Sequence, residues 1–185
     1  MRKLRLLLPL ALAFALLIAA CGDDDDAADT TAAPTTTLPI VTVPPQPGAT
    51  LWDVIANSPD LSELKALIEA ADPLVQETLE DPNATLTLFA PSNTAIEDAA
   101  NTVPPPDLSD QALVTSILLA HVNGTEALTA ADVLALTEVP VLEGGPQPVD
   151  DGPPPTIGGA GLLVTDVVAA NGVLHVIDAV MPIQP

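Results

Sequence analysis

Residues 85–99 read Thr-Leu-Thr-Leu-Phe-Ala-Pro-Ser-Asn-Thr-Ala-Ile-Glu-Asp-Ala, and this stretch decides the fold. Leu86 and Leu88 alternate with threonines, and this period of two predicts a β-strand. Pro91 has no backbone N–H to donate to a strand ladder, so it ends the strand. Ser92 is a favourable N-cap, and apolar residues follow it at helical spacing. The sequence therefore predicts a strand that turns directly into a helix.

Helical patterns occur on both sides of this stretch. Apolar residues within 51–55 predict a short helix, Asp60–Glu63 is close to a capping box for a second helix, and Asp72-Pro73 ends that helix and begins a third. Downstream, 109–120 predicts an amphipathic helix, and Thr129 caps a further short helix. The residues of 109–120 expected to face the core are Leu113, Val114, Ile117 and Leu118.

The last third of the chain predicts strands. Its short apolar segments, interrupted by glycine and proline, are 139–142, 147–150, 156–157, 162–168 and 173–180. Asn171-Gly172 separates the last two and is typical of a hairpin turn, because both residues tolerate positive φ. Helices early and strands late predict an α+β fold that an antiparallel hairpin closes.

The N-terminus has the pattern of a signal peptide over residues 1–20. Three basic residues within 2–5 precede an apolar run, 6–20, which is shorter than the roughly 18 residues of a membrane span. Ile18-Ala19-Ala20-Cys21 resembles the lipobox of bacterial lipoproteins, in which the cysteine becomes the lipidated N-terminus. The alternative is ordinary cleavage that leaves a free thiol. We expect Cys21 to be lipidated and the protein to be anchored in the cell membrane, facing the extracytoplasmic side.

Residues 21–49 differ in composition from the rest of the chain. Asp23–Asp26 is a run of four acidic residues, and 30–47 is rich in threonine and proline. Such a segment cannot bury a core, so 21–49 is expected to be a disordered tether. The remaining residues, 50–185, are expected to form one folded domain.

Charge excludes several kinds of partner. Without residues 1–20 the chain would hold 25 acidic residues against one lysine, Lys65, a net charge of −24. Such a surface repels phosphates, so no nucleic-acid partner is expected. Cys21 is the only cysteine, and therefore no intrachain disulfide can form.

Three segments together resemble the fasciclin (FAS1) domain family. Residues 87–96, Thr-Leu-Phe-Ala-Pro-Ser-Asn-Thr-Ala-Ile, are similar to its first signature, and 171–180, Asn-Gly-Val-Leu-His-Val-Ile-Asp-Ala-Val, to its second. Between them, 118–122 matches the family segment Leu-Leu-Tyr-His-Val, except that Ala120 replaces the tyrosine. The similarity covers about 50–182.

This resemblance implies a wedge of β-strands packed against several α-helices. FAS1 domains are mostly non-enzymatic extracellular modules associated with cell adhesion and partner binding, and some are bacterial lipoproteins with a single copy. The expected partner is another protein or a cell-envelope component, with no cofactor and no metal, and the domain is expected to be monomeric. An integrin-binding role assigned to the Tyr-His segment in animal members is not carried over, since this chain lacks the tyrosine.

The two histidines outside the signal sequence have structural and functional interpretations. His175 lies in an apolar strand and is expected to be a hydrogen-bonded core residue. His121 follows a helix and is expected to cap it, with a partner contact as the alternative. Two other functions stay open: a hydrolase that pairs a serine with His121 or His175, and a pocket that carries a small apolar molecule.

Overall fold

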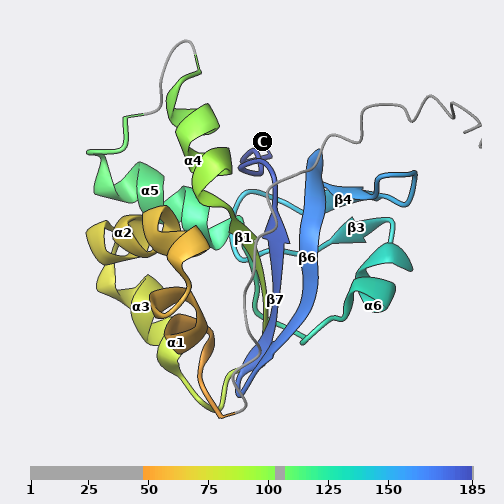
Figure 1. The fold of residues 1–185 in the computed structure, drawn as a ribbon, viewed down its shortest axis with the longest axis horizontal. Coiled ribbons are helices and arrows are strands. Elements are labelled where there is room, and N and C mark those ends of the chain that lie inside the picture. Colours follow the sequence, from red (N-terminus) through yellow and green to blue (C-terminus); the bar gives the residue numbers. More distant parts are fainter. Residues whose placement is uncertain (1–47, 103–106, 185) are drawn as a thin grey trace, which may run out of the picture. The chain divides into compact units, whose positions relative to one another are not determined.

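The computed structural model describes residues 48–102 and 107–184 (Figure 1). In these ranges several helices pack against a seven-stranded mixed sheet, which confirms the α+β class and the FAS1-like arrangement of strands and helices. The expected signal peptide 1–20, Cys21 and all but the last two residues of the expected tether 21–49 lie outside the described residues.

Helices make up most of the first half of the described chain. They are α1 (Leu51–Ala56), the 3₁₀ turn η1 (Pro59–Leu61), α2 (Ser62–Ala70), α3 (Pro73–Glu80), α4 (Asn93–Ala100), α5 (Gln111–Leu119) and α6 (Ala130–Leu134). The predicted caps at Ser92 and Thr129 and the predicted helix start at Asp72-Pro73 are confirmed. The side chains of Asp72, Ser92 and Thr129 each accept a hydrogen bond from a backbone amide in the first turn of α3, α4 or α6.

Seven strands form the sheet in the order β2-β1-β7-β6-β5-β4-β3. Their bounds are β1 (Leu86–Pro91), β2 (Val122–Asn123), β3 (Glu138–Val139), β4 (Gln147–Asp150), β5 (Thr156–Ile157), β6 (Ala160–Ala169) and β7 (Gly172–Ile177). β1 and β7 pair in parallel, from Leu86 opposite Gly172 to Pro91 opposite Ile177. All other pairings are antiparallel, including the predicted β6–β7 hairpin.

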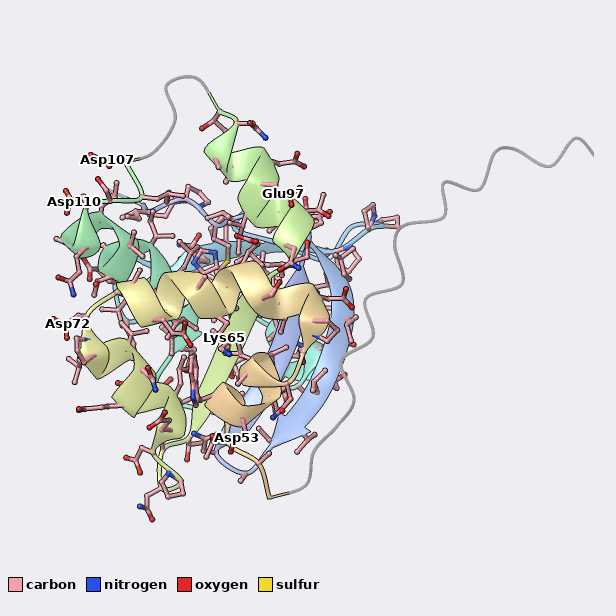
Figure 2. The ribbon with its side chains drawn as sticks, turned by 60° about the vertical axis from the view of Figure 1, so that its left-hand side comes forward. Asp53, Lys65, Asp72, Glu97, Asp107 and Asp110 are labelled. Carbon is pink, nitrogen blue, oxygen red and sulfur yellow. The ribbon has the colours of Figure 1, made fainter. Side chains whose placement is uncertain are left out.

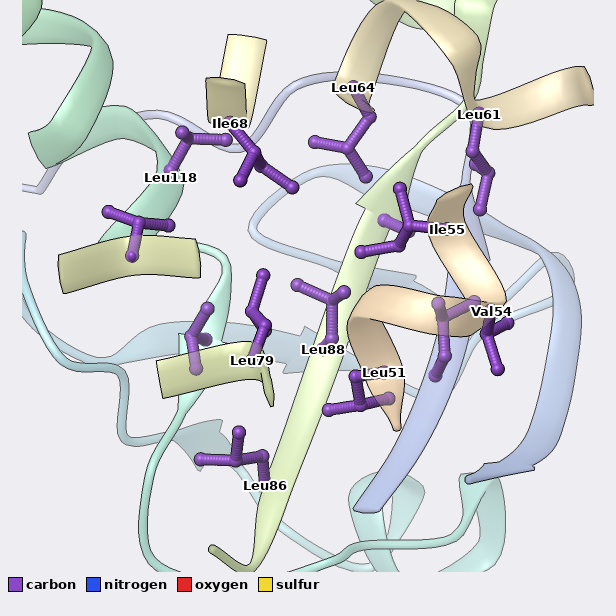
Figure 3. Close-up of a cluster of buried hydrophobic side chains, with 14 of the residues drawn as sticks. Leu51, Val54, Ile55, Leu61, Leu64, Ile68, Leu79, Leu86, Leu88 and Leu118 are labelled. Atoms are coloured by element: carbon purple, nitrogen blue, oxygen red, sulfur yellow. The ribbon is translucent and has the colours of Figure 1, made fainter. Parts of the chain in front are cut away.

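Strand β1 is buried along its whole length and separates two apolar clusters. On one face, Leu86 and Leu88 belong to the larger cluster, which α1, α2, α3 and α5 cover (Figure 3). On the other face, Phe89 belongs to the smaller cluster with residues from α6, β5 and β7. Thr87 also points to this second side, where its hydroxyl donates to Glu126 O (2.7 Å). The predicted division of β1 into two faces is confirmed, and both faces are covered.

The hairpin turn uses Asn171 in a way that its sequence pattern does not predict. The predicted hairpin forms, but Asn171 does not take a positive φ, since Asp166 is the only non-glycine residue with positive φ in the described part. Asn171 is buried instead, and its Oδ1 accepts from Leu51 N (2.8 Å). Its Nδ2 donates to Leu79 O and to Asp81 O, each at 2.9 Å. The asparagine therefore serves to join the turn to α1 and α3.

The start of α2 also differs from the expectation. Asp60 lies inside the 3₁₀ turn η1, so the helix has Leu61 at its N-cap and no side-chain cap from its own segment. The Glu63 amide, which the predicted capping box assigned to Asp60, donates to Asn93 Oδ1 (3.0 Å). Asn93 Nδ2 also donates to Pro59 O at 3.0 Å. The first residue of α4 thus completes the start of α2.

Candidate functional site

His121 follows α5 and joins it to the segment after β7. Its Nδ1 donates to Ile117 O (2.7 Å) in the last turn of α5, and its Nε2 accepts from Met181 N (2.9 Å). A carbonyl can only accept and an amide can only donate, so these partners fix the neutral ring with its proton on Nδ1. The side chain is 1 % exposed. This burial lowers the pKa of His121 to about 4.

The position of His121 decides what the residue can do. Its bond to Ile117 O satisfies a carbonyl at the end of α5, which is the helix-capping role that the sequence predicts. Because both ring nitrogens are engaged and the ring is buried, it presents no atom for the partner contact that was the alternative interpretation. A partner that binds on this side of the domain must therefore contact the residues that cover His121.

His175 lies in the middle of β7 and is fully buried. Its ring stacks on Phe89 of β1, with ring centroids 5.6 Å apart. Nε2 donates to Leu128 O (3.0 Å), and Nδ1 accepts from Asp166 N (3.3 Å). Burial lowers the pKa of His175, against weaker opposing effects of the Leu128 carbonyl and the Asp166 charge. The predicted role as a hydrogen-bonded core histidine is confirmed.

A small apolar cavity lies between α2, α4 and α5. Its volume is about 50 Å³, and Leu64, Ile96, Leu108, Ile117 and His121 are among its lining residues. Pockets for small molecules usually have about 300–1,000 Å³. The cavity is therefore too small for the enclosed apolar ligand that one of the sequence-based alternatives requires.

Beside this cavity, α4, α5 and the segment after β7 form an open groove of about 460 Å³. We call it the α4–α5 groove, and its lining residues are Ala99, Thr102, Leu113, Ile117, Val180, Met181, Pro182 and Ile183. Leu113 and Ile117 were expected to face the core, but they are half-buried, whereas Val114 and Leu118 are fully buried. The sequence signal for the groove is thus an apolar face on α5 that is wider than the core requires.

Acidic side chains dominate the surface of the described residues. Lys65 on α2 is the only lysine or arginine within 48–102 and 107–184, and its Nζ lies 3.8 Å from a Glu69 carboxylate oxygen (Figure 2). In the same ranges, histidine, cysteine, aspartate and glutamate side chains form no cluster of three that could hold a metal ion. None of the described helices is long and apolar enough to cross a membrane.

Comparisons with known proteins agree with this architecture. The family model of the Fasciclin domain matches residues 59–183. A solved FAS1 domain pair from the insect cell adhesion molecule Fasciclin I is similar, with a TM-score of 0.51 and 25% sequence identity. The alignment covers 67% of this chain and 45% of that one. No curated protein sequence matches the chain. With the family model matched from η1 to the segment after β7, the chain belongs to the fasciclin family.

Proposed function

We propose that this protein is a membrane-anchored, extracytoplasmic FAS1 module that binds another protein or a cell-envelope component without catalysing a reaction. The observation that carries the proposal is the Fasciclin domain match over 59–183, which takes in nearly every described helix and strand. The family occurs in adhesion proteins, among them the insect cell adhesion molecule Fasciclin I. Binding is therefore the function that the fold supports best.

The histidines support a non-catalytic role. A hydrolase of the serine–histidine kind needs an imidazole nitrogen that can take a proton from the nucleophile. In His121 and His175, all four ring nitrogens are engaged with backbone groups of the domain itself. Lys65, the only lysine or arginine among the described residues, is at the surface beside Glu69.

The sequence before the domain supports the anchor. Cys21 follows the lipobox-like Ile18-Ala19-Ala20, and the acidic and Thr/Pro-rich stretch 21–49 separates it from the domain. An acylated Cys21 would attach the domain to the membrane, and 21–49 would let it reach partners beyond the lipid headgroups. The domain itself, with its excess of carboxylates, would not adhere to anionic headgroups.

The anchor is tested by metabolic labelling with an alkyne analogue of palmitate. The full chain should incorporate the label and fractionate with membranes, and Cys21→Ala should lose both properties. The control is Thr94→Ala, an alanine substitution at an exposed position of α4, which should leave labelling unchanged. Label that persists in Cys21→Ala would contradict the anchor.

Partner binding is tested by photo-crosslinking the protein to components of the envelope of the cell that produces it. A chain that begins at residue 21 is added to envelope preparations that lack the native protein, and crosslinked products are compared with those of the heat-unfolded chain. The proposal expects a saturable product that requires the folded domain. Equal crosslinking by the folded and unfolded chains would contradict it.

A further inference from the structure

We infer that the α4–α5 groove is the docking site of the domain, and that its occupant is a basic peptide segment of a partner protein that carries a large apolar side chain. This inference rests on the proposed binding function and adds to it a site and a partner chemistry. It uses three features of the described residues: the apolar floor of the groove, the cavity behind that floor and the charges around it.

The floor of the groove is apolar and accessible. It combines α5 residues with the segment after β7, and Ile183 at its end is 40 % exposed. Met181 holds this segment against the domain, because its backbone N–H donates to His121 Nε2 and its side chain is buried. Gln147 Nε2 holds the next residue through Pro182 O (3.0 Å). The groove is therefore a preformed surface that does not depend on a partner for its shape.

The cavity lies directly behind this floor. Ala99, Ile117 and Val180 line both the groove and the 50 Å³ cavity, so they form the wall between them. Most apolar side chains in a domain rest on close-packed neighbours and cannot move inward. Here an apolar side chain that presses on Ile117 or Val180 has empty space behind the wall. The floor can thus adapt to an anchor residue of the partner.

The charges around the groove are of one sign. Asp98 and Asp178 line a depression next to it, which shares Ala99, Thr102 and Val180. On α5, one residue before Ile117, Ser116 Oγ donates to a Glu143 carboxylate oxygen (2.6 Å).

Further carboxylates lie on α4 and in the segment before α5. Figure 2 shows Glu97 on α4 and Asp107 ahead of α5. Lys65 is not among the residues that line the groove or the cavity.

These features favour a cationic peptide over other occupants. A phospholipid membrane with anionic headgroups would be repelled by the carboxylates, and so would a second copy of this acidic chain. A small apolar molecule would stay largely in contact with water in an open groove. A lysine- or arginine-rich segment gains attraction from the carboxylates and places its apolar side chain on the floor.

The test uses a fluorescein-labelled helical peptide of about 14 residues, made only of leucine and lysine, as a probe for an amphipathic basic segment. Fluorescence anisotropy measures its binding to the chain from residue 21, with Cys21→Ser to prevent intermolecular disulfides. In one control peptide serine replaces leucine, and in the other glutamate replaces lysine. The inference expects the leucine–lysine peptide to bind most tightly, with an affinity that falls as salt is raised.

Protein variants separate the groove from general attraction to an acidic surface. Ile183→Asp should weaken binding by about tenfold or more, because it puts a charge on the apolar floor. Leu74→Asp, at an apolar position on α3 that is 62 % exposed, is the matched control and should change affinity less than about twofold. Asp98→Asn should lower the affinity and the salt dependence more than Glu77→Gln on α3. Circular dichroism confirms that each variant is folded.

Three results would overturn the inference: equal weakening by Ile183→Asp and Leu74→Asp, no effect of Ile183→Asp, or no binding of the leucine–lysine peptide. NMR amide shifts on titration should concentrate in α4, α5 and 180–183, and shifts spread over all acidic surfaces would also overturn it. Envelope crosslinking with Ile183→Asp distinguishes this failure from failure of the proposed function. If the variant crosslinks like the native chain, the groove is wrong and the binding function stands.

Discussion

Leu51 and Asn171 are 120 positions apart, and the Leu51 amide donates a 2.8 Å hydrogen bond to Asn171 Oδ1. The same asparagine side chain binds the carbonyls of Leu79 and Asp81 through Nδ2. One buried amide group therefore connects the first turn of α1, the end of α3 and the β6–β7 turn. This connection places the helical layer on the sheet, and several predictions about stability depend on such contacts.

Asn171→Ala should destabilise the domain by about 3 kcal/mol, because it removes the partner of the buried Leu51 amide and of the buried Leu79 carbonyl and one of the two donors to Asp81 O. Urea denaturation followed by circular dichroism measures the change. Asn57→Ala is the control: Asn57 Nδ2 donates to Asp53 O at the surface, and its loss should cost less than about 1 kcal/mol. Similar losses in both variants would contradict the connecting role of Asn171.

Gly172→Ala should be more damaging, with a loss of about 4 kcal/mol or a failure to fold. A Cβ at Gly172 would lie 2.1 Å from Leu86 O, a backbone atom that the β1–β7 pairing holds in place. Gly124→Ala is the matched control, since its Cβ would meet only the flexible end of the Leu142 side chain. Thermal unfolding of both variants checks the prediction, and a normal melting temperature for Gly172→Ala would refute it.

The stability of the domain should fall as the pH is lowered from about 6.5 to about 4. His121 has a pKa of about 4 in the folded domain and 6.5 when unperturbed, so between these values the unfolded chain binds more protons. The contribution is about 3 kcal/mol, complete above pH 6.5 and lost by pH 4. His175 acts in the same direction, since burial lowers its pKa as well.

The pH prediction is checked by urea unfolding at a series of pH values. His121→Gln removes the titration and should reduce the slope of stability against pH between 4 and 6.5. The carboxylates titrate in both chains, so the difference between the two slopes belongs to His121. An unchanged slope in the variant would show that the imidazole is not held neutral by the fold.

Asn93→Ala should cost about 1–2 kcal/mol, because the Glu63 amide loses its cap and Pro59 O loses a donor. Hydrogen exchange of the Glu63 amide should become faster by a larger factor than that of amides in α5. Thr94→Ala, next to Asn93 but exposed, should leave this exchange unchanged. Protection of Glu63 that survives in Asn93→Ala would exclude the cap across the two helices.

Local patterns predict those parts of the fold that depend on neighbours in sequence. Asp72, Ser92 and Thr129 each cap the helix that their sequence context indicates, because an N-cap bond closes within three residues. The parallel pairing of Leu86 with Gly172 has no local signal, since it depends on which strands meet after collapse. The same holds for Asn171 and Asn93, whose side chains bind segments at least 30 positions away.

The candidate site was harder to predict from the sequence than the fold was. His121 is visible as a histidine after a helix, but only the structure shows that Ile117 and Met181 occupy both of its nitrogens. The α4–α5 groove includes Val180, from the predicted strand segment 173–180, and residues 181–183, which have no pattern of their own. Leu113 and Ile117 continue the apolar face of α5, and periodicity alone does not distinguish a wall of the core from a surface that a partner covers.

The parallel pairing of β1 with β7 also determines when the protein can fold. A polypeptide synthesised or secreted from its N-terminus releases β7 after all six other strands, yet β7 lies between β1 and β6. Leu86 and Leu88 therefore have no strand neighbour on that side until residues 172–177 have emerged. The domain must therefore complete its folding after residues 172–177 have emerged from the ribosome or the translocation pore.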